Sequence, residues 1–325
     1  MTSLRIGTRG SELALFQANA VASLLLRTCG LETTTVVIKT SGDRLSEAAL
    51  SEIGGKRLFV KEIEDALLEG RIDLAVHSSK DMPVVLPERL QISAVLERED
   101  ARDAIVFPSA RGEQGDSSIE SLTRALGREP RIGTSSVRRS AQLRRLWPAA
   151  RFLPVRGNLD TRLRKLDSGD YDALVLAAAG LRRLGRGDRI TAALQVDACV
   201  PAPGQGIIAI ETRADDEAAI AAAARIADAN ATAALVAERA VITRLGGGCQ
   251  MPIGAYADVR DRTLHMTAVV VSLDGARAAH ASADGTIDDP EALGARVADR
   301  LRAEGAEDIL ADVTRAHAAV EGLQP

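Results

Sequence analysis

The 325-residue sequence has few aromatic residues, few cysteines and few histidines. Aromatic residues make up 2% of the chain, so a base-stacking platform or a carbohydrate cleft built on rings is not expected. The three cysteines, Cys29, Cys199 and Cys249, are too sparse for a disulfide framework and favour a reducing compartment. The four histidines are far apart, and no Cys/His spacing resembles a metal site.

The chain also lacks a membrane-directed segment and a strong net charge. No stretch approaches the roughly 18 uncharged apolar residues of a membrane span. Arg5, Arg9 and Glu12 interrupt the first apolar stretch, so no signal peptide is visible. The net charge of −4 argues against a basic nucleic-acid coat. With 46% hydrophobic residues, the sequence predicts a folded cytoplasmic protein of two or three domains.

The first two thirds of the chain alternate between strand and helix patterns. We predict strands at residues 4–7, 33–39, 72–76, 90–96, 104–107, 130–133, 151–155, 172–176 and 207–211. Helices are predicted at residues 12–27, 59–69, 137–146 and 159–166, with Ser11 as an N-cap and Gly30 as a stop for the first. Residues 41–58 are predicted to be a long functional loop, and residues 109–115 a linker. The alternation favours mostly parallel sheets.

The last third has a different pattern. Residues 200–206 contain helix and strand breakers and mark a crossing or hinge. Residues 215–245 are helical with a break near Asn230, and a glycine loop follows. Strands at 252–257, 263–273 and 277–286, then helices at 290–303 and 306–320, predict a smaller α+β unit with an antiparallel sheet.

Basic residues are concentrated in one segment of this acidic chain. Between Arg131 and Lys165 there are ten basic residues and one acidic residue, Asp160. Arginines and small or hydroxyl residues gather where predicted strands end and helices begin: Thr134, Ser135, Ser136, Arg138 and Arg139 at one junction, and Arg156, Gly157 and Arg162 at the next, with Arg162 in the first turn of its helix. Parallel sheets bind ligands at the carboxyl ends of their strands. Helix N-termini and arginine forks there favour carboxylates or phosphates, so we predict a polyanionic ligand.

Other arginines in this segment are better explained as a solvated basic helix face. Arg144, Arg145, Arg151 and Arg164 belong to this group. An arginine is also weaker evidence of a functional role in this chain than usual. Only five of the 41 basic side chains are lysines, so the preference for arginine extends over the whole sequence. Even so, the first strand repeats the junction pattern with Thr8, Arg9 and Ser11.

Two further positions could carry chemistry. Asp81, in Ser78-Ser79-Lys80-Asp81, follows an apolar strand and could hold a proton or stabilise a cation; equally, it could cap the turn before Pro83. Cys249 follows three glycines and could be an exposed nucleophile or attachment point, or a packing residue. Cys29 and Cys199 are predicted to be packing residues.

Six motifs together resemble the porphobilinogen deaminase (hydroxymethylbilane synthase) family. They are RIGTRGSELAL at 5–15, VHSSKDMP at 76–83, GTSSVRR at 133–139, RGN at 156–158, PGQG at 203–206 and GCQMPIG at 248–254. The resemblance implies a transferase of haem and tetrapyrrole biosynthesis. Such an enzyme condenses four porphobilinogen molecules head to tail, releases ammonia and forms hydroxymethylbilane.

The family resemblance also implies a cofactor and roles for individual residues. The cofactor is a dipyrromethane held through a thioether, here on Cys249, and Asp81 matches the catalytic aspartate. Arg9, Arg138, Arg139, Arg156, Arg162 and Arg183 match the arginines that bind the acetate and propionate groups. Further contacts are implied at Ser11, Ser78, Lys80, Thr134, Ser135, Ser136, Gly157 and Gln205, and Gln17 is a weaker match. Lys56 and Phe59 match the flexible active-site loop, whereas Gly10, Glu12, Ser79 and Val137 depart from the motif at positions expected to tolerate variation.

The implied architecture is a three-domain α/β fold. Domain 1 would contain residues 1–104 and 201–225, domain 2 residues 105–200, and domain 3 residues 226–325 with Cys249. The first two would be periplasmic-binding-protein-like, with mixed, mostly parallel sheets. The resemblance further implies a monomer whose partner is the small molecule porphobilinogen, without nucleic acid, membrane or metal.

Two other functions fit part of the sequence. A non-catalytic, two-lobed anion-binding or ligand-sensing protein would also use junction arginines, but it does not explain Asp81 or Cys249. Nucleic-acid binding by the basic segment would need more aromatic residues or a recognisable module, and neither is visible.

Overall fold

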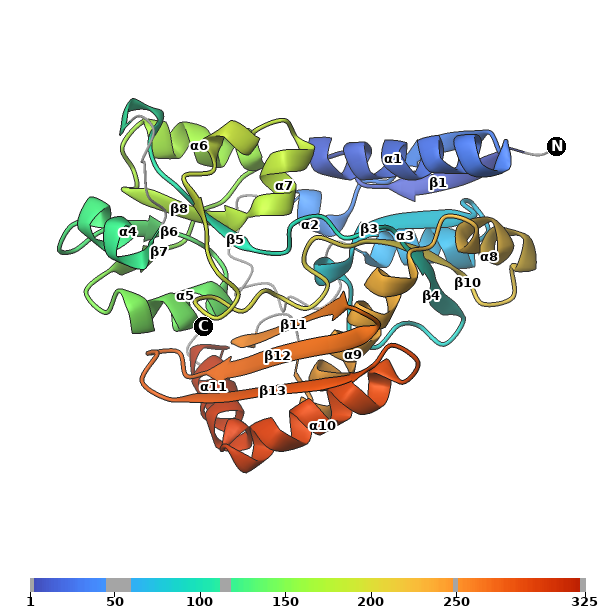
Figure 1. The fold of residues 1–325 in the computed structure, drawn as a ribbon. Helices are drawn as coiled ribbons and strands as arrows, with labels where there is room; N and C mark the ends of the chain where they lie inside the picture. Colours follow the sequence, from blue (N-terminus) through green and yellow to red (C-terminus); the bar gives the residue numbers. More distant parts are fainter. Residues whose placement is uncertain (1–2, 45–59, 112–117, 248–250, 322–325) are drawn as a thin grey trace.

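The computed structural model describes residues 3–44, 60–111, 118–247 and 251–321. Within these residues the chain forms three sheets with helices packed against them (Figure 1). We refer to each sheet with its helices as the first, second or third unit. Figure 1 shows the first and second units side by side, with the third unit below both.

The first unit has a five-stranded sheet of order β2-β1-β3-β10-β4. Its strands are β1 (Leu4–Thr8), β2 (Thr33–Val37), β3 (Leu74–Ser78), β4 (Leu90–Val95) and β10 (Ile208–Arg213). Strand β10 pairs antiparallel with both of its neighbours, whereas β1 pairs parallel with β2 and β3. The sheet is therefore mixed, with β10 running against the other strands.

Helices cover both faces of the first sheet. They are α1 (Glu12–Cys29), α2 (Ser41–Arg44), α3 (Lys61–Leu68) and α8 (Glu217–Ala224), and the 3₁₀ turn η2 (Ser79–Asp81) follows β3. Leu74 on one face packs with α1 and α8, and the next residue, Ala75, packs with α3 on the other. Because both faces of the sheet are covered, successive residues of β3 from Leu74 to Val76 are apolar.

The second unit repeats this plan with a sheet of order β7-β6-β8-β5-β9. Its strands are β5 (Asp103–Val106), β6 (Arg131–Gly133), β7 (Arg151–Leu153), β8 (Ala173–Ala177) and β9 (Ala192–Ala193). Its helices are α4 (Ile119–Leu126), α5 (Val137–Leu146), α6 (Leu159–Asp167) and α7 (Ala178–Arg183), with 3₁₀ turns η3 (Ser109–Arg111) and η4 (Gly187–Arg189). Strand β5 runs against the others.

The third unit is a three-stranded antiparallel sheet backed by helices. Its strands are β11 (Ile253–Arg260), β12 (Thr263–Val271) and β13 (Ala278–Thr286), and its helices are α9 (Ala229–Leu245), α10 (Pro290–Ala303) and α11 (Ala306–Glu321). Helix α9 also packs on the first unit, where Leu235 contacts a cluster that includes Met82. Val269 and Val271 of β12 pack against Ala141 of α5 in the second unit. The third unit therefore contacts both of the others.

These sheets confirm the predicted fold class, and most elements lie close to their predicted bounds. Helices α5 and α10 have the predicted residues, and Ser11 and Gly30 cap α1 as predicted. The prediction of one loop over residues 41–58 was wrong at its start, where α2 forms, and the rest lies outside the described residues. Of the predicted linker at 109–115, residues 109–111 form η3 after β5 in the second unit, and the rest lies outside the described residues. Helices α4 and α7 and strand β9 were not predicted.

We also searched the described helices for candidate membrane spans. No single helix there is long and apolar enough to cross a membrane. Helices α8 and α9, which are bent by 112° at their junction, pass the length and composition test only as a pair.

Candidate active site

The end of β3 presents the predicted catalytic residue. Strand β3 runs into η2, whose Ser79 N–H donates to the carbonyl of Ile207 at 3.0 Å. Asp81 ends this turn and is exposed. Lys80 beside it is partly buried, and this burial, reinforced by Arg139 and Arg138, lowers its pKa to about 8. Lys80 is therefore a cation that its surroundings make easier to deprotonate.

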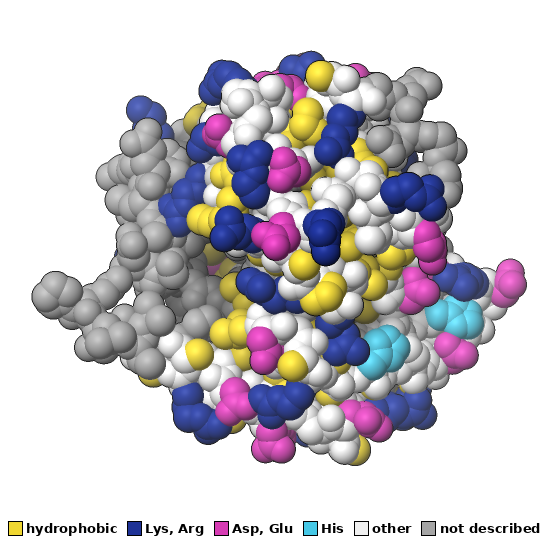
Figure 2. All heavy atoms as spheres, turned by 90° about the vertical axis from the view of Figure 1, so that its left-hand side faces the viewer, with side chains coloured by type: hydrophobic (Ala, Val, Ile, Leu, Met, Phe, Trp, Pro, Cys, Tyr) yellow, Lys and Arg dark blue, Asp and Glu magenta, His cyan; other side chains and the backbone are white. Residues whose placement is uncertain are grey.

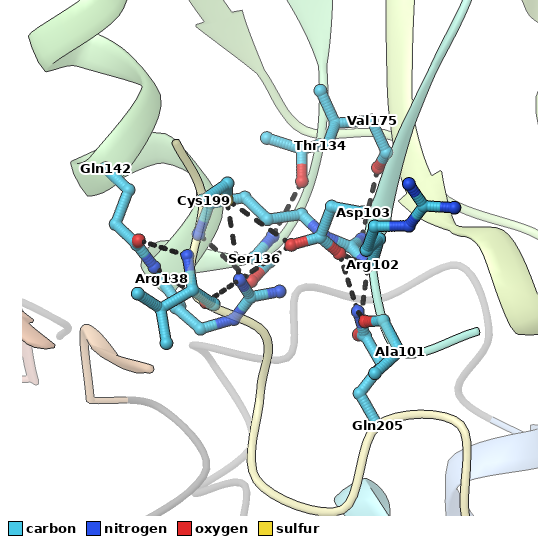
Figure 3. A network of polar contacts seen from close by, with 12 residues as sticks. Ala101, Arg102, Asp103, Thr134, Ser136, Arg138, Gln142, Val175, Cys199 and Gln205 are labelled. Atoms are coloured by element: carbon cyan, nitrogen blue, oxygen red, sulfur yellow. Dashed lines mark hydrogen bonds and ion pairs between the residues drawn. The ribbon is translucent and has the colours of Figure 1, made fainter. Parts of the chain in front are cut away.

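The two predicted binding arginines of α5 converge on one buried carboxylate, that of Asp103. Figure 3 shows Arg138 and Asp103 within this polar network. Arg138 Nη1 lies 2.7 Å from Asp103 Oδ2, while Arg139 reaches Oδ1 with Nε at 2.8 Å and Nη2 at 2.7 Å. Asp103 is fully buried, and the two arginines are 5% and 8% exposed. Burial alone would raise the pKa of Asp103, but the two guanidinium groups outweigh it and hold this pKa well below its usual range.

The two arginines differ in the donors that remain. Arg139 gives Nη1 to the carbonyl of Val175 at 3.1 Å, in addition to its two contacts with Asp103. Arg138 gives Nη1 to Asp103 and to the carbonyl of Val200, at 2.7 Å each, but its buried Nε has no hydrogen-bond partner. Arg138 therefore keeps a donor for a ligand, whereas most of the donor capacity of Arg139 is used within the protein.

Arg162 joins this group from α6. Burial and the nearby Arg139 lower the pKa of Arg162, while Asp81 raises it. Arg162 of the second unit therefore interacts electrostatically with Asp81, the predicted catalytic carboxylate of the first unit. Its Nε donates to the carbonyl of Gly157 at 2.8 Å. Gly157 has φ of +104°, and a Cβ there would lie 2.6 Å from Thr161 Cγ2, so the turn after β7 requires glycine. Arg156, in the same turn, is partly buried.

Most of the predicted hydroxyl ligands bond to the protein itself. Ser11 caps α1 and Ser136 caps α5, each accepting a backbone N–H at 3.4 Å. Ser135 Oγ donates to the carbonyl of Val155 at 2.7 Å, and Thr134 Oγ1 accepts from the Ser136 N–H. The remaining pair joins Ser78 Oγ to Gln17 Nε2 at 2.8 Å.

The predicted residues Gln205, Arg183 and Arg9 lie at or near the strand ends. Gln205 lies in residues 200–206, where the chain returns from the second unit to the first; we call this segment the returning crossing. Gln205 is buried and donates from Nε2 to Asp103 at 2.8 Å and to the carbonyl of Ala101 at 2.6 Å. Arg183 donates to the carbonyl of Gly206 at 2.7 Å, so it contacts the same crossing. Arg9 follows β1 and is partly buried.

A cavity of about 90 Å³ lies where the three units meet. Its polar lining is contributed by η2 of the first unit, α5 of the second and α9 of the third; these residues are Ser79, Lys80, Ser136, Arg138 and Arg239. Apolar residues, including Leu235 and Ile253, form much of the remaining wall. Met251 also lines the cavity, and it follows Cys249 by two positions in sequence.

Three predicted site residues, Lys56, Phe59 and Cys249, lie outside the described residues. Among the described residues, no group of three or more His, Cys, Asp or Glu side chains could hold a metal ion. Cys199 is buried as predicted, and burial raises the pKa of its thiol to about 12, but it also donates to Asp103 at 3.3 Å. It is therefore part of the Asp103 network as well as a packing residue.

Sequence reasoning missed Asp103 and the cavity position of Ser79. Asp103 directly precedes the apolar run of Ala104, Ile105 and Val106, and all of these residues are buried. A carboxylate at the start of a fully buried strand needs a cation, and that signal was available. Ser79 had no comparable signal, because its environment depends on residues far away in the sequence.

Figure 2 shows the side of the molecule formed by the second and third units. Lys and Arg side chains there are interspersed with Asp and Glu rather than gathered in one continuous patch. Arg131 pairs with Asp172 at 2.9 Å, Arg144 stacks on Phe152 and Arg145 donates to the carbonyl of Gly275. This face gives no support to nucleic-acid binding by the basic segment.

Comparisons with known proteins agree with the motif pattern. The family model "Porphobilinogen deaminase, dipyromethane cofactor binding domain" matches residues 4–221, and "Porphobilinogen deaminase, C-terminal domain" matches residues 232–303. The porphobilinogen deaminase of Acidithiobacillus ferrooxidans is 47% identical over 315 residues, covering 97% of this chain and 99% of that protein. The one from Geobacter metallireducens is 44% identical over 319 residues, covering 98% and 97%.

Solved structures give a looser likeness. The second substrate-binding domain of a putative amino acid ABC transporter from Streptococcus pneumoniae has a TM-score of 0.44 and 12% identity, covering 69% of this chain and 90% of that one. At this score the likeness carries no argument. The family models and the relatives, in contrast, cover almost the whole sequence, and the chain therefore belongs to the porphobilinogen deaminase family.

Proposed function

We propose that this chain condenses four porphobilinogen molecules into hydroxymethylbilane, with Asp81 as the catalytic carboxylate and Cys249 as the attachment point of a dipyrromethane. The observation that carries the proposal is that cations from two units meet here: Lys80 and Arg138 line the cavity, and Lys80 and Arg162 interact electrostatically with Asp81. Each porphobilinogen has an acetate and a propionate, so the substrate and its oligomers are polycarboxylates. Buried cations with remaining donors suit such a ligand.

Asp81 suits the chemical step because it is exposed at the end of β3, with cations beside it. Loss of the amine from porphobilinogen leaves a positive charge that is delocalised over the pyrrole ring. A fixed carboxylate can stabilise this cation, accept a hydrogen bond from the pyrrole N–H and move a proton to the leaving amine. Lys80 and Arg162 would hold carboxylates of the growing pyrrole chain, which includes the cofactor, while Asp81 acts on the ring of the incoming unit.

The residues present fit a carboxylate-bearing cofactor. Two buried donors, Ser79 Oγ and Arg138 Nε, have no partner, and both residues line the cavity with Lys80. When bound, the dipyrromethane supplies the pyrrole carbon to which the first new unit is joined. Lys80, Arg138 and Arg162 would hold its acidic side chains, and the thioether to Cys249 would keep the growing chain at one site.

We further propose that the enzyme is a cytoplasmic monomer with domains at residues 1–104 and 201–225, 105–200, and 226–325. The three sheets support a division into three units, although the proposed boundary between residues 104 and 105 falls inside β5 (Asp103–Val106), which pairs entirely within the second sheet. The alternative, a non-catalytic anion-binding protein, is not favoured, because the family to which the chain belongs is one of enzymes.

Intact-mass analysis of the purified protein tests the carrier role. We expect an added mass equal to two linked pyrroles, and we expect Cys249→Ser to lose it together with turnover. Asp81→Asn should keep both the fold and the added mass but lose most of the turnover. Unmodified protein that forms hydroxymethylbilane would refute the carrier role, and near-normal turnover of Asp81→Asn would remove this residue from the mechanism.

A further inference from the structure

Ser79 differs from the other hydroxyl residues near the proposed active site. Its side chain lies in the cavity wall and is 3% exposed, and its Oγ has no hydrogen-bond partner. Ser11, Ser135 and Ser136, in contrast, bond to the backbone. A buried hydroxyl without a partner is costly, because it loses its hydrogen bonds to water and gains none in return. A ligand in the cavity would remove this cost.

Arg138 lines the same cavity and also has an unpartnered donor. Asp103 and the carbonyl of Val200 accept hydrogen bonds from its Nη1, each at 2.7 Å. Its Nε is buried and has no partner. Asp103 therefore acts as a positioning residue, because it fixes the guanidinium by one nitrogen and leaves another for a ligand.

The charges around the cavity identify the chemical class of that ligand. Asp103 is a single negative charge shared by Arg138 and Arg139. Lys80 lines the cavity and interacts electrostatically with Asp81, but it has no hydrogen-bonded acid among the described residues. Arg239 in the opposite wall donates to the carbonyls of Pro83 and Val84. The balance of charge is positive, and both unpartnered atoms are donors. An anion that accepts hydrogen bonds fits this charge and these donors best, and the volume can hold a short carboxylate arm in place of several water molecules.

We propose that the Ser79 hydroxyl and Arg138 Nε together bind one carboxylate of the pyrrole chain, so that Ser79 is a binding residue of this enzyme. This inference rests on the proposed function, which supplies the carboxylate, but it assigns a residue that the family motifs leave open. Gly204 makes room for it: this residue has φ of +72°, and a Cβ there would lie 2.5 Å from Ser79 Oγ. The missing side chain of Gly204 therefore leaves space for the Ser79 hydroxyl between the cavity wall and residues 200–206.

A four-protein thermal unfolding cycle tests the assignment. It compares the wild type, Ser79→Ala, Cys249→Ser and the double variant, because Cys249→Ser provides the chain without the covalent cofactor. Without cofactor, Ser79→Ala should leave the melting temperature unchanged or raise it, since only an unpartnered hydroxyl is lost. With cofactor, the same substitution should lower the melting temperature by roughly 2–4 °C, the shift expected for one hydrogen bond.

Steady-state kinetics identify which carboxylate is bound. If Ser79→Ala reduces the difference in melting temperature between the proteins with and without cofactor, the site binds the dipyrromethane. If this difference is unchanged and the KM of Ser79→Ala for porphobilinogen rises roughly tenfold, the site binds the incoming substrate. Ser93→Ala is the matched control: this serine of β4 pairs with Thr212 at 2.6 Å, and its loss should act equally with and without cofactor.

The two proposals fail in different ways. If the wild type carries no added mass and makes no product, the proposed function fails. If the wild type carries cofactor and turns over, but Ser79→Ala changes neither the cofactor-dependent shift nor KM, the Ser79 subsite is wrong.

Discussion

At the scale of single residues, neighbours in sequence have different tasks. Arg138 and Arg139 share the Asp103 carboxylate, yet only Arg138 lines the cavity and keeps a buried donor without a partner. Ser78 pairs with Gln17, whereas Ser79 has an unpartnered hydroxyl. The motifs could not separate these roles, because residue type was the same at both positions of each pair.

Lys80 leads to a prediction about pH. Burial lowers its pKa from 10.5 to about 8, so the cation is lost as pH rises through about 8. Carboxylate binding should weaken over the same range, and kcat/KM should fall with an apparent pKa near this value. Lys80→Arg, which stays protonated, should move this fall to higher pH. Identical pH profiles for the wild type and Lys80→Arg would exclude Lys80 as the titrating group.

At the scale of elements, helix α5 positions the binding arginines. It begins in the turn after β6, and its N-cap Ser136 accepts the N–H of Arg139. Cations in the first turn of a helix oppose the helix dipole, and the buried charge of Asp103 compensates for Arg138 and Arg139. The start of α5 therefore depends on one local contact, the cap, and one distant contact, Asp103.

Substitution of the cap should have a modest and specific effect. We expect Ser136→Ala to lower the free energy of unfolding by about 1 kcal/mol, because one N–H at the start of α5 loses its acceptor. Ser136→Asn should retain most of this stability, since asparagine is an equally good N-cap. Urea denaturation of both variants checks the prediction, and equal losses for alanine and asparagine would contradict it.

At the scale of the whole molecule, a buried ion pair joins the units. Glu238 of α9 is fully buried and accepts Arg98 Nη1 at 2.5 Å, the Gly204 N–H at 2.7 Å and the Ala257 N–H at 2.8 Å. Arg98 follows β4 and also donates from Nε to the carbonyl of Gln205 at 2.9 Å. One carboxylate thus holds together the first unit, the returning crossing and the third unit.

Replacement of Glu238 should strongly destabilise the protein. Glu238→Ala leaves the Arg98 cation buried without its partner and orphans two backbone N–H groups, so we expect a loss of about 3–5 kcal/mol in the free energy of unfolding. Glu238→Gln should lose less, because its amide oxygen can still accept a hydrogen bond. Adding Arg98→Met to Glu238→Gln should recover part of the loss, since no buried charge then remains. Denaturant titrations of the three proteins measure these differences, and a cost near zero for Glu238→Ala would show that the pair does not join the units.

The elements that were predicted well have strong local signals. Helix α1 has apolar residues at helical spacing, a serine cap and a terminal glycine with φ of +65°. Helices α4 and α7 were missed for different reasons. Helix α4 follows a polar, glycine-containing segment, and α7 begins directly after β8 without a turn residue between them. Strand β9 has two residues and exists only through its pairing with β5.

The sequence by itself determined the family, the alternation of strands and helices, and the kinds of side chain that meet a polycarboxylate, because motifs, periodicity and caps are local. Only the tertiary structure decided that Asp103 holds two arginines lying 35 and 36 positions away in sequence, and that Ser79 meets Arg138 at a cavity between three units. These contacts arise from packing between distant segments, and the free energy of burying a charge or a hydroxyl depends on partners that no local pattern specifies.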